Sequence, residues 1–229
     1  MGENLEKICG LICAYNEQRN IARVVIGSRK YINDVIVVDD GSHDRTAIIA
    51  LEAGAKLLQH ERNLGKGLAL KTGFDYFFRK DFGAIVTLDA DGQHLPEEIP
   101  LLISQLRNGF DAVIAKRDFR GKNVPFTRKI GNLFDSYILT KLLSADIYDA
   151  QNGFRAFRKD CLLRLYNTIK NGGFPYEAEL VVKLIKNKFK VGWVDITTIY
   201  SKELESKIKP LKHTLESFNL YGRCLVGNV

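Results

Sequence analysis

The sequence predicts an α/β protein with a mostly parallel central sheet, because short apolar runs alternate with longer helical patterns. The runs at 35–38 and 84–86 contain no polar residue, which is typical of strands covered on both faces. Strands that are separated by helices favour parallel pairing through right-handed crossovers. The 229 residues are 45% hydrophobic and 27% charged, a globular composition that excludes a disordered or fibrous chain.

Each expected element has a local signal. β-Branched runs predict strands and helical spacing predicts helices, while Gly41 permits a tight turn, Gly65 precedes a helix start and Pro96 suits a first helical turn. The expected elements are a strand at 8–14, a helix at 17–30, a strand at 35–38, a helix at 44–53, a strand at 55–59, a helix at 66–80, a strand at 84–88, a helix at 97–108, a strand at 111–115, a helix at 127–144, and then a mixed segment with strands at 153–158 and 189–196.

Residues 1–200 form one expected domain, because no Pro-rich or Ser-rich linker divides them. Residues 201–229 differ, since they are rich in lysine at first and apolar afterwards. This segment has two interpretations: an amphipathic piece that rests on an anionic membrane surface, or a terminal helix packed against the core.

Charge and cysteine content narrow the function classes. The formal net charge of +7 favours anionic partners, namely phosphorylated substrates, acidic lipid or nucleic acid. Cys9, Cys13, Cys161 and Cys224 have no metal-ligand spacing, so reduced thiols and a cytoplasmic chain are expected. No signal peptide and no stretch of about 18 apolar residues is found. We therefore expect a soluble protein or one that is peripheral on the cytoplasmic membrane face.

Acidic residues follow three of the expected strands. Because ligands of open α/β sheets bind beyond the carboxyl ends of the strands, Glu17, Asp39, Asp40, Asp89 and Asp91 are expected to converge there. Clustered carboxylates would repel one another and raise each other's pKa. A divalent cation or a ligand rich in donors is therefore the expected partner.

Asp89, Asp91 and Gln93 alternate along an extended segment and can present oxygen atoms on one side. A few oxygen ligands completed by water and substrate phosphate suit Mg²⁺ or Mn²⁺ and do not suit zinc. The alternative is a solvated turn whose Asp residues cap the helix that begins near Pro96.

Asp39-Asp40-Gly41-Ser42 also has two readings that are compatible. Ser42 or Asp44 can cap the next helix, while a carboxylate at the strand end can accept hydrogen bonds from a ribose or a base. The loop around Lys66 is suited to binding a phosphate group, because it places glycines and a cation at the start of a helix. A nicotinamide fingerprint, a P-loop and a G-x-S-x-G elbow are not found. A nucleic-acid-binding module is favoured by charge alone, and the acidic strand ends oppose it.

Together these residues resemble glycosyltransferase family 2, whose members have the GT-A nucleotide-sugar fold, a Rossmann-like sheet flanked by helices. Within it they are most similar to polyprenol-phosphate sugar synthases of the dolichol-phosphate mannose synthase type. The resemblance is carried by Cys13–Glu17, where Cys13 stands in place of the usual Pro, by Asp39–Ser42, Asn63–Gly67, Asp89–His94, Arg117, Arg128–Ile130, Asn152–Phe157, Glu179 and Ser206–Lys207.

The resemblance implies roles for individual residues. The residues implied to bind the nucleotide-sugar donor are Cys13, Ala14, Tyr15, Glu17, Val38, Asp39, Asp40, Lys66, Asp89, Ala90 and Asp91. Those implied to hold Mg²⁺ or Mn²⁺ are Asp89, Asp91 and Gln93, and those implied to be catalytic are Asp89, Asp91 and Arg117. Arg117, Arg128 and Lys207 are implied to gather phosphate charge from the acceptor.

The resemblance further implies an inverting transfer of a hexose, with mannose favoured, from a GDP- or UDP-sugar to a polyprenyl monophosphate. Such an acceptor is already an anion and needs no strong general base. If the acceptor were a glycan hydroxyl, a carboxylate would have to take its proton, with Asp149, Glu177 or Glu179 as candidates. The sequence leaves both acceptors open.

Overall fold

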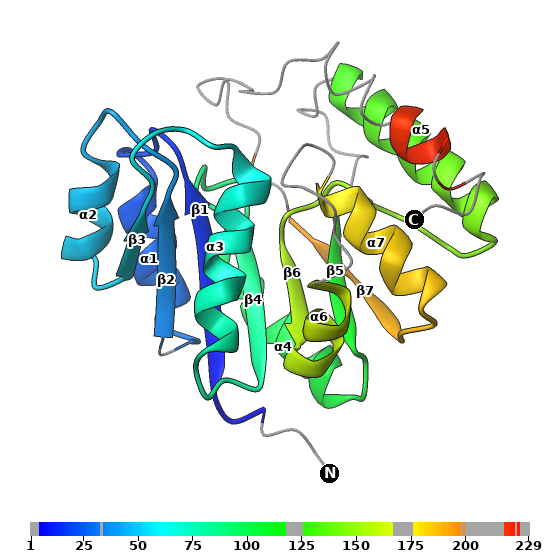
Figure 1. The fold of residues 1–229 in the computed structure, drawn as a ribbon, viewed down its shortest axis with the longest axis horizontal. Coiled ribbons are helices and arrows are strands. Elements are labelled where there is room, and N and C mark those ends of the chain that lie inside the picture. Colours follow the sequence, from blue (N-terminus) through cyan, green and yellow to red (C-terminus); the bar gives the residue numbers. More distant parts are fainter. Residues whose placement is uncertain are drawn as a thin grey trace.

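A computed structural model describes residues 5–32, 34–117, 126–166, 176–197, 199, 218–222 and 224, with the backbone alone for residues 126–130. Within this part of the chain, seven strands form one sheet in the order β3-β2-β1-β4-β6-β5-β7 (Figure 1). The strands are β1 (Ile8–Ala14), β2 (Asp34–Asp39), β3 (Lys56–Gln59), β4 (Ala84–Asp89), β5 (Ala112–Arg117), β6 (Arg155–Arg158) and β7 (Val191–Ile196).

Helices cover both faces of the sheet (Figure 1). They are α1 (Ile21–Ser28), α2 (Thr46–Glu52), α3 (Lys66–Phe78), the 3₁₀ helix η1 (Pro96–Glu98), α4 (Ile99–Arg107), α5 (Phe126–Leu143), α6 (Lys159–Tyr166) and α7 (Tyr176–Lys186). Buried residues of α1, α2 and α4 form one core cluster with the sheet, and those of α3, α5, α6 and α7 form a second. The strands between these clusters are therefore covered twice, as their apolar sequences predict.

The mostly parallel sheet is confirmed, with one correction. β6 runs antiparallel to both of its neighbours, β4 and β5, although strands separated by helices were expected to pair in parallel. The reason lies just before β6, where Asp149 bonds to Arg117 at the end of β5. The chain is thus still at the carboxyl edge of the sheet when β6 starts, so β6 must run away from that edge.

The expected strands and the five expected helices exist, with ends that move by a few residues. The largest shift is in α1, which begins at Ile21 where the sequence predicted a helix from residue 17. Two helices, α6 and α7, lie in the expected mixed segment, between its strands β6 and β7, where no helix bounds were predicted. β5, the central strands and β7 share one direction, so their carboxyl ends lie at the same edge.

Strand register sets the positions of the acidic residues. Cys13 of β1 lies beside Val38 of β2 and Asp89 of β4, and Ala14 lies beside Asp39. The ends of three neighbouring strands are therefore level. This confirms that the sheet brings the segments after β1, β2 and β4 together at one edge.

The four cysteines are free thiols, as the sequence predicts. Near the C-terminus, residues 218–222 form a short helix in which Leu220 and Tyr221 are buried against the core. Of the two interpretations of this segment, packing against the core therefore holds for Leu220 and Tyr221. The lysine-rich residues 201–217 lie outside the described part. No helix among the described residues is both long enough and apolar enough to span a bilayer.

Helix α3 approaches β1 closely because residue 73 is glycine. A Cβ atom placed at Gly73 would lie 2.3 Å from Cδ1 of Leu11, a side chain that is fully buried in β1. This contact holds α3 against the sheet and thereby keeps Lys66, the first residue of α3, at the carboxyl edge.

Gly73→Ala is expected to lower the free energy of unfolding by about 1–3 kcal/mol, because the added methyl group overpacks a dense core. Urea denaturation measures the change. Gly131→Ala in α5 is the matched control, since its Cβ meets no atom within 4 Å, and it should raise stability by up to about 1 kcal/mol. Equal stability of the Gly73→Ala protein and the unmodified protein would contradict the close approach.

Candidate active site

The segment after β1 is bonded to the turn after β2. The backbone N–H of Asn16 donates to Oγ of Ser42 over 2.9 Å, and that of Glu17 donates to Oγ1 of Thr46 over 2.7 Å. Asn16 adopts a left-handed backbone with φ of 53°, which asparagine tolerates better than most residues. Ser42 is therefore used to fix the Tyr15–Glu17 turn and not to cap α2, which was one expectation for it.

Asp39 and Asp40 are both buried at the end of β2 or directly after it. Asp39 accepts hydrogen bonds from the hydroxyl of Ser42 and, over 3.1 Å, from Nε2 of Gln59. These bonds fix the turn that follows β2. A contact between Asp39 and a nucleoside stays a prediction.

Asp40 shapes the loop that leads into α3. Its carboxylate accepts the backbone N–H groups of Leu64 at 2.9 Å and Gly65 at 2.8 Å, and it contacts Nδ1 of His60 at 2.7 Å. The three bonds close residues 60–65 over the edge of the sheet. Asp40 thus positions Lys66. The contact between Asp40 and the donor stays a prediction.

Lys66 joins three elements by ion pairs. Its Nζ lies 2.5 Å from Oδ1 of Asp89 at the end of β4 and 2.7 Å from Oε1 of Glu177 in α7. Burial would lower the pKa of Lys66, but the charges of Asp89 and Glu177 raise it above its ordinary value. Lys66 is therefore a permanent cation among carboxylates. It also lines a small pocket whose apolar wall includes Phe74 and Leu180.

The two aspartates of the Asp-x-Asp motif have opposite pKa shifts. Burial would raise the pKa of Asp89, but Lys66, His94 and Arg117 lower it to about 2. Burial and the charge of Asp89 raise the pKa of Asp91 to about 6. The expected mutual rise therefore holds for Asp91 alone, because Lys66 already compensates the charge of Asp89.

His94 is held as a neutral ring behind the motif. Burial lowers its pKa to about 4, and its ring centroid lies 5.3 Å from that of Phe154. The motif also forms a turn, since the backbone N–H of Gln93 donates to Oδ1 of Asp91 over 2.9 Å. The turn expected as the alternative to a metal site is thus present, but the expected cap is not, because no side chain caps η1 at Pro96.

The residues present fit a hard divalent cation. Asp89, Asp91 and Gln93 supply oxygen atoms, and the raised pKa of Asp91 marks a carboxylate whose charge the protein leaves poorly compensated. Among the described residues, no three His, Cys, Asp or Glu side chains are arranged to hold a metal by themselves. A cation here would need oxygen ligands from Gln93, water or a bound phosphate as well.

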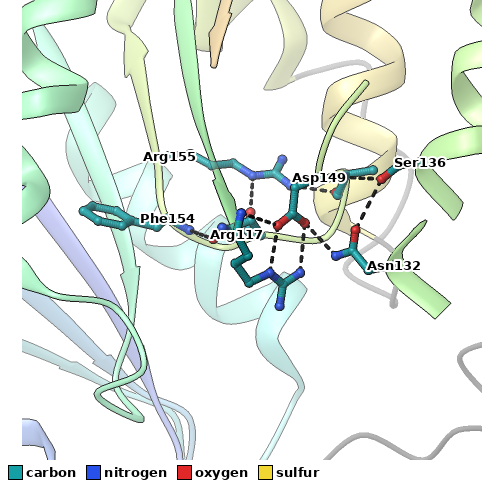
Figure 2. A network of polar contacts seen from close by, with 8 residues as sticks. Arg117, Asn132, Ser136, Asp149, Phe154 and Arg155 are labelled. Carbon is teal, nitrogen blue, oxygen red and sulfur yellow. Dashed lines mark hydrogen bonds and ion pairs between the residues drawn. The ribbon is translucent and has the colours of Figure 1, made fainter. Parts of the chain in front are cut away.

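Arg117, the last residue of β5, is fixed by a buried carboxylate (Figure 2). Its Nε donates to Oδ2 of Asp149 over 2.7 Å and its Nη2 donates to Oδ1 over 2.8 Å. Asn132 of α5 donates to the same carboxylate over 2.7 Å. Burial opposes ionisation of Asp149, but the charge of Arg117 and these bonds lower its pKa. Such a bidentate pair fixes both the charge and the orientation of a guanidinium.

A second arginine lies behind this pair. Arg155 is 1% exposed and donates to three main-chain carbonyls, those of Asn152 at 2.5 Å, Glu177 at 2.7 Å and Ala150 at 2.8 Å. Burial lowers its pKa to about 10, so it remains charged at neutral pH. Arg155 thus fastens the loop before β6 to the start of α7.

The ion pair between Lys66 and Asp89 requires a glycine at position 153. A Cβ atom at this position would lie 2.8 Å from both carboxylate oxygens of Asp89 and from Nζ of Lys66. Its carbonyl accepts a 2.7 Å hydrogen bond from the hydroxyl of Thr87 in β4. Any side chain here would displace the charged groups at the edge.

The structure places the predicted residues unequally. Ala14, Val38, Ala90 and Cys13 are buried or half-buried at the strand ends, next to the charged cluster. Arg128 belongs to α5, where the structure describes only its backbone. Lys207 lies outside the described residues.

The roles of Asn132 and Ser136 and the Lys66–Glu177 ion pair were not predicted from the sequence. Asn132 and Ser136 are spaced i, i+4 and so share one face of α5, but this helix contains several other polar residues, so the spacing did not single them out.

Comparison with known proteins identifies the family. Residues 10–165 match the family described as Glycosyl transferase family 2. The chain is 34% identical over 214 residues to the UDP-N-acetylglucosamine--dolichyl-phosphate N-acetylglucosaminyltransferase of Methanococcus voltae, covering 84% of this chain and 85% of that protein. It is 30% identical over 234 residues to the polyprenol monophosphomannose synthase of Mycolicibacterium smegmatis, covering 93% of this chain and 87% of that protein.

Among solved structures, the fold is similar to that of glucosyl-3-phosphoglycerate synthase from Mycobacterium tuberculosis, determined with Mn²⁺, UDP and glucosyl-3-phosphoglycerate. The TM-score is 0.73 at 19% identity, and the match covers 97% of this chain and 79% of that chain. This similarity confirms the predicted GT-A fold. Together with the sequence match, it shows that the chain is a glycosyltransferase that belongs to glycosyl transferase family 2.

Proposed function

We propose that the protein transfers a hexose, with mannose favoured, from a nucleotide diphosphate sugar to a polyprenyl monophosphate with inversion. The observation that carries the proposal is one sheet edge with two kinds of charge: the carboxylates Asp89 and Asp91, and the guanidinium of Arg117, which Asp149 holds in place. An acidic half suits a cation-bound diphosphate, and a fixed arginine suits an anionic acceptor. The two relatives named above act on dolichyl or polyprenol phosphate by name.

The donor half of the site is formed by the ends of β1, β2 and β4. Tyr15 and Glu17 lie on the turn that Ser42 and Thr46 fix, and Asp40 holds the loop that precedes Lys66. Lys66 lies at this edge, where it would meet the diphosphate of the donor. Because it is paired with Asp89 and Glu177, it compensates their charge when an anion approaches.

Asp89, Asp91 and Gln93 would hold Mg²⁺ or Mn²⁺, which when bound offsets the charge that develops on the departing nucleotide diphosphate. The solved structural relative contains Mn²⁺ together with UDP. Ionised Asp91 supplies a ligand whose charge Lys66 does not already pair at hydrogen-bond distance.

The three carboxylates considered as general bases support a phosphate acceptor. Asp149 is paired with Arg117, Glu177 with Lys66, and Glu179 with Lys183 at 3.4 Å. The charge of Arg117 lowers the pKa of Asp149 although burial opposes its ionisation, and a carboxylate with a lowered pKa is a weaker base. A polyprenyl monophosphate needs no base, since its oxygen is already ionised, whereas a hydroxyl would require one.

Transfer of a UDP-linked sugar to a glycan hydroxyl is the second candidate. The Methanococcus relative uses a UDP-sugar by name, which favours the uracil donor of this candidate, whereas the name of the Mycolicibacterium relative specifies mannose and no nucleotide. The two acceptor classes can be distinguished by the solubility of the product, since a glycosylated lipid phosphate enters the organic phase and a glycan stays in the aqueous phase.

Incubation with radiolabelled GDP-mannose, UDP-glucose or UDP-N-acetylglucosamine, Mn²⁺ and a polyprenyl monophosphate should yield label in the organic phase for one donor. Phase extraction and counting measure it, and omission of the lipid phosphate is the control. Label that enters only an aqueous glycan would overturn the lipid acceptor.

Asp91→Asn should reduce metal-dependent turnover on the order of 10²-fold or more, because a cation supplies several kcal/mol and each 1.4 kcal/mol is tenfold. Manganese titration by electron paramagnetic resonance should show weaker binding, while circular dichroism stays unchanged. Asp81→Asn, at an ion-paired side chain that is 92% exposed, is the matched control. Normal activity and normal manganese binding in Asp91→Asn would remove this residue from the metal site.

Asp149→Asn should raise KM for the lipid phosphate roughly 10-fold or more, because loss of one partner of a buried charge pair costs about 2–5 kcal/mol. KM for the nucleotide sugar should stay within about 2-fold, since the donor half lies on other strands. Steady-state kinetics with each substrate varied gives both values. A parallel rise in both constants would show general loss of structure and would count against a separate acceptor half.

A further inference from the structure

The ammonium group of Lys66 lies against a carboxylate of the proposed metal site. Its Nζ is 2.5 Å from Oδ1 of Asp89, and a Cβ atom at Gly153 would come within 2.8 Å of Nζ and of both carboxylate oxygens of Asp89. A divalent cation bound to Asp89 would therefore have a positive charge as its close neighbour. Two positive charges so close repel each other, and the repulsion is strong where water is partly excluded.

The position of Lys66 is fixed from two sides. Its Nζ also lies 2.7 Å from Oε1 of Glu177, whose side chain is 9% exposed. Lys66 is the first residue of α3, and the backbone N–H of Gly65 just before it donates to Asp40 over 2.8 Å. The ammonium group is thus held at Asp89 both by α7 and by its own backbone.

The Asp-x-Asp motif offers a cation little uncompensated charge. Among the described residues, no three His, Cys, Asp or Glu side chains are arranged to hold a metal. The charge of Asp89 is already paired with Lys66, which leaves the carboxylate of Asp91 and the neutral amide of Gln93. A hard cation needs a full set of oxygen ligands and is attracted by their charge. The protein alone therefore makes a weak site for a divalent cation.

A diphosphate would reverse this balance. The side chain of Lys66 is 30% exposed and that of Asp89 is 27% exposed, so a ligand can reach both groups. Phosphate oxygens would give the ammonium group an anionic partner, and they would give the cation the oxygen ligands that the protein lacks. The ammonium group that repels a cation alone thus binds the diphosphate that accompanies the cation.

We propose that Lys66 keeps the site at Asp89 and Asp91 weak for a divalent cation alone and makes it tight when the cation arrives with the diphosphate of the donor. Glu177 contributes by holding the ammonium group at Asp89. This inference rests on the metal site of the proposed function. The ion pairs of Lys66 then have a task beyond joining β4, α3 and α7, because they make the cation and the nucleotide sugar enter the site together.

The first test removes the charge of Lys66. Lys66→Gln and Lys66→Met both keep helix propensity, and glutamine also keeps an N–H donor. Manganese titration by electron paramagnetic resonance, without nucleotide, measures the Kd of the cation. Both variants should bind Mn²⁺ on the order of 10-fold more tightly than the unmodified protein, because the repelling charge is gone.

Lys71→Met is the matched control for this titration. Lys71 lies on the same helix, its side chain is 51% exposed, and its Nζ is 3.6 Å from Oδ2 of Asp75. An exposed ion pair contributes little, so this variant should bind Mn²⁺ within about 2-fold of the unmodified protein.

The second test measures the anion. Isothermal titration calorimetry with UDP and with GDP, in the presence of a chelator, gives the Kd of the nucleotide diphosphate without metal. Lys66→Gln and Lys66→Met should bind the nucleotide on the order of 10-fold more weakly, because the diphosphate loses a charged partner. Tighter binding of the cation together with weaker binding of the anion identifies an effect of charge, since damage to the structure would weaken both.

Mn²⁺ binding that is unchanged or weaker in both variants overturns the inference. A variant that folds, by circular dichroism, only after Mn²⁺ is added supports it, because the cation then replaces the ammonium group beside Asp89. A variant that stays unfolded with Mn²⁺ counts against it. Neither test involves sugar transfer, so the two results hold even if the proposed transfer to a lipid phosphate fails. Absence of Mn²⁺ binding in the unmodified protein and in both variants, with either nucleotide present, would remove the metal site and this inference with it.

Discussion

The ion pairs of Lys66 are the interaction on which the site depends. The ammonium group of Lys66 contacts carboxylates from β4 and α7. Lys66 is also the first residue of α3, which packs on β1. Burial of two carboxylates without a cation would be costly, because each charge would lose its hydration. Lys66 makes that burial possible and fixes the relative positions of the three elements. Gly73 and Gly153 are then needed, since both remove side-chain volume where these elements approach each other.

The two halves of the site solve the same electrostatic problem in different ways. In the donor half, a lysine compensates one aspartate and leaves Asp91 undercompensated, which raises the pKa of Asp91. In the acceptor half, Asp149 is fully buried and is matched by the bidentate contact of Arg117 and by Asn132. An undercompensated carboxylate favours a cation, while a guanidinium held in one orientation favours an anion. Each half is therefore suited to a ligand of different charge.

The sequence predicted most of the fold, because apolar runs and helical spacing are local signals. It located the edge of the sheet at which Glu17, Asp39, Asp40, Asp89 and Asp91 lie, because that follows from the parallel order of strands. The place of Arg117 in the site came only from the family resemblance. It did not predict the antiparallel β6, whose direction depends on a contact between Asp149 and Arg117 that are 32 residues apart. Nor did it predict the low pKa of Asp89, since the pairing with Lys66 depends on how α3 packs.

The reversed direction of β6 has a structural consequence for how the molecule is assembled. Residues before Asp89 form the donor half on consecutive parallel strands, whereas the loop before β6 returns to the same edge and supplies Asp149 and Gly153. The segment between β5 and β6 therefore begins and ends at that edge. Changes of length within it leave the register of β1, β2 and β4 untouched, so this segment can vary without moving the strand ends that carry Asp39 and Asp89.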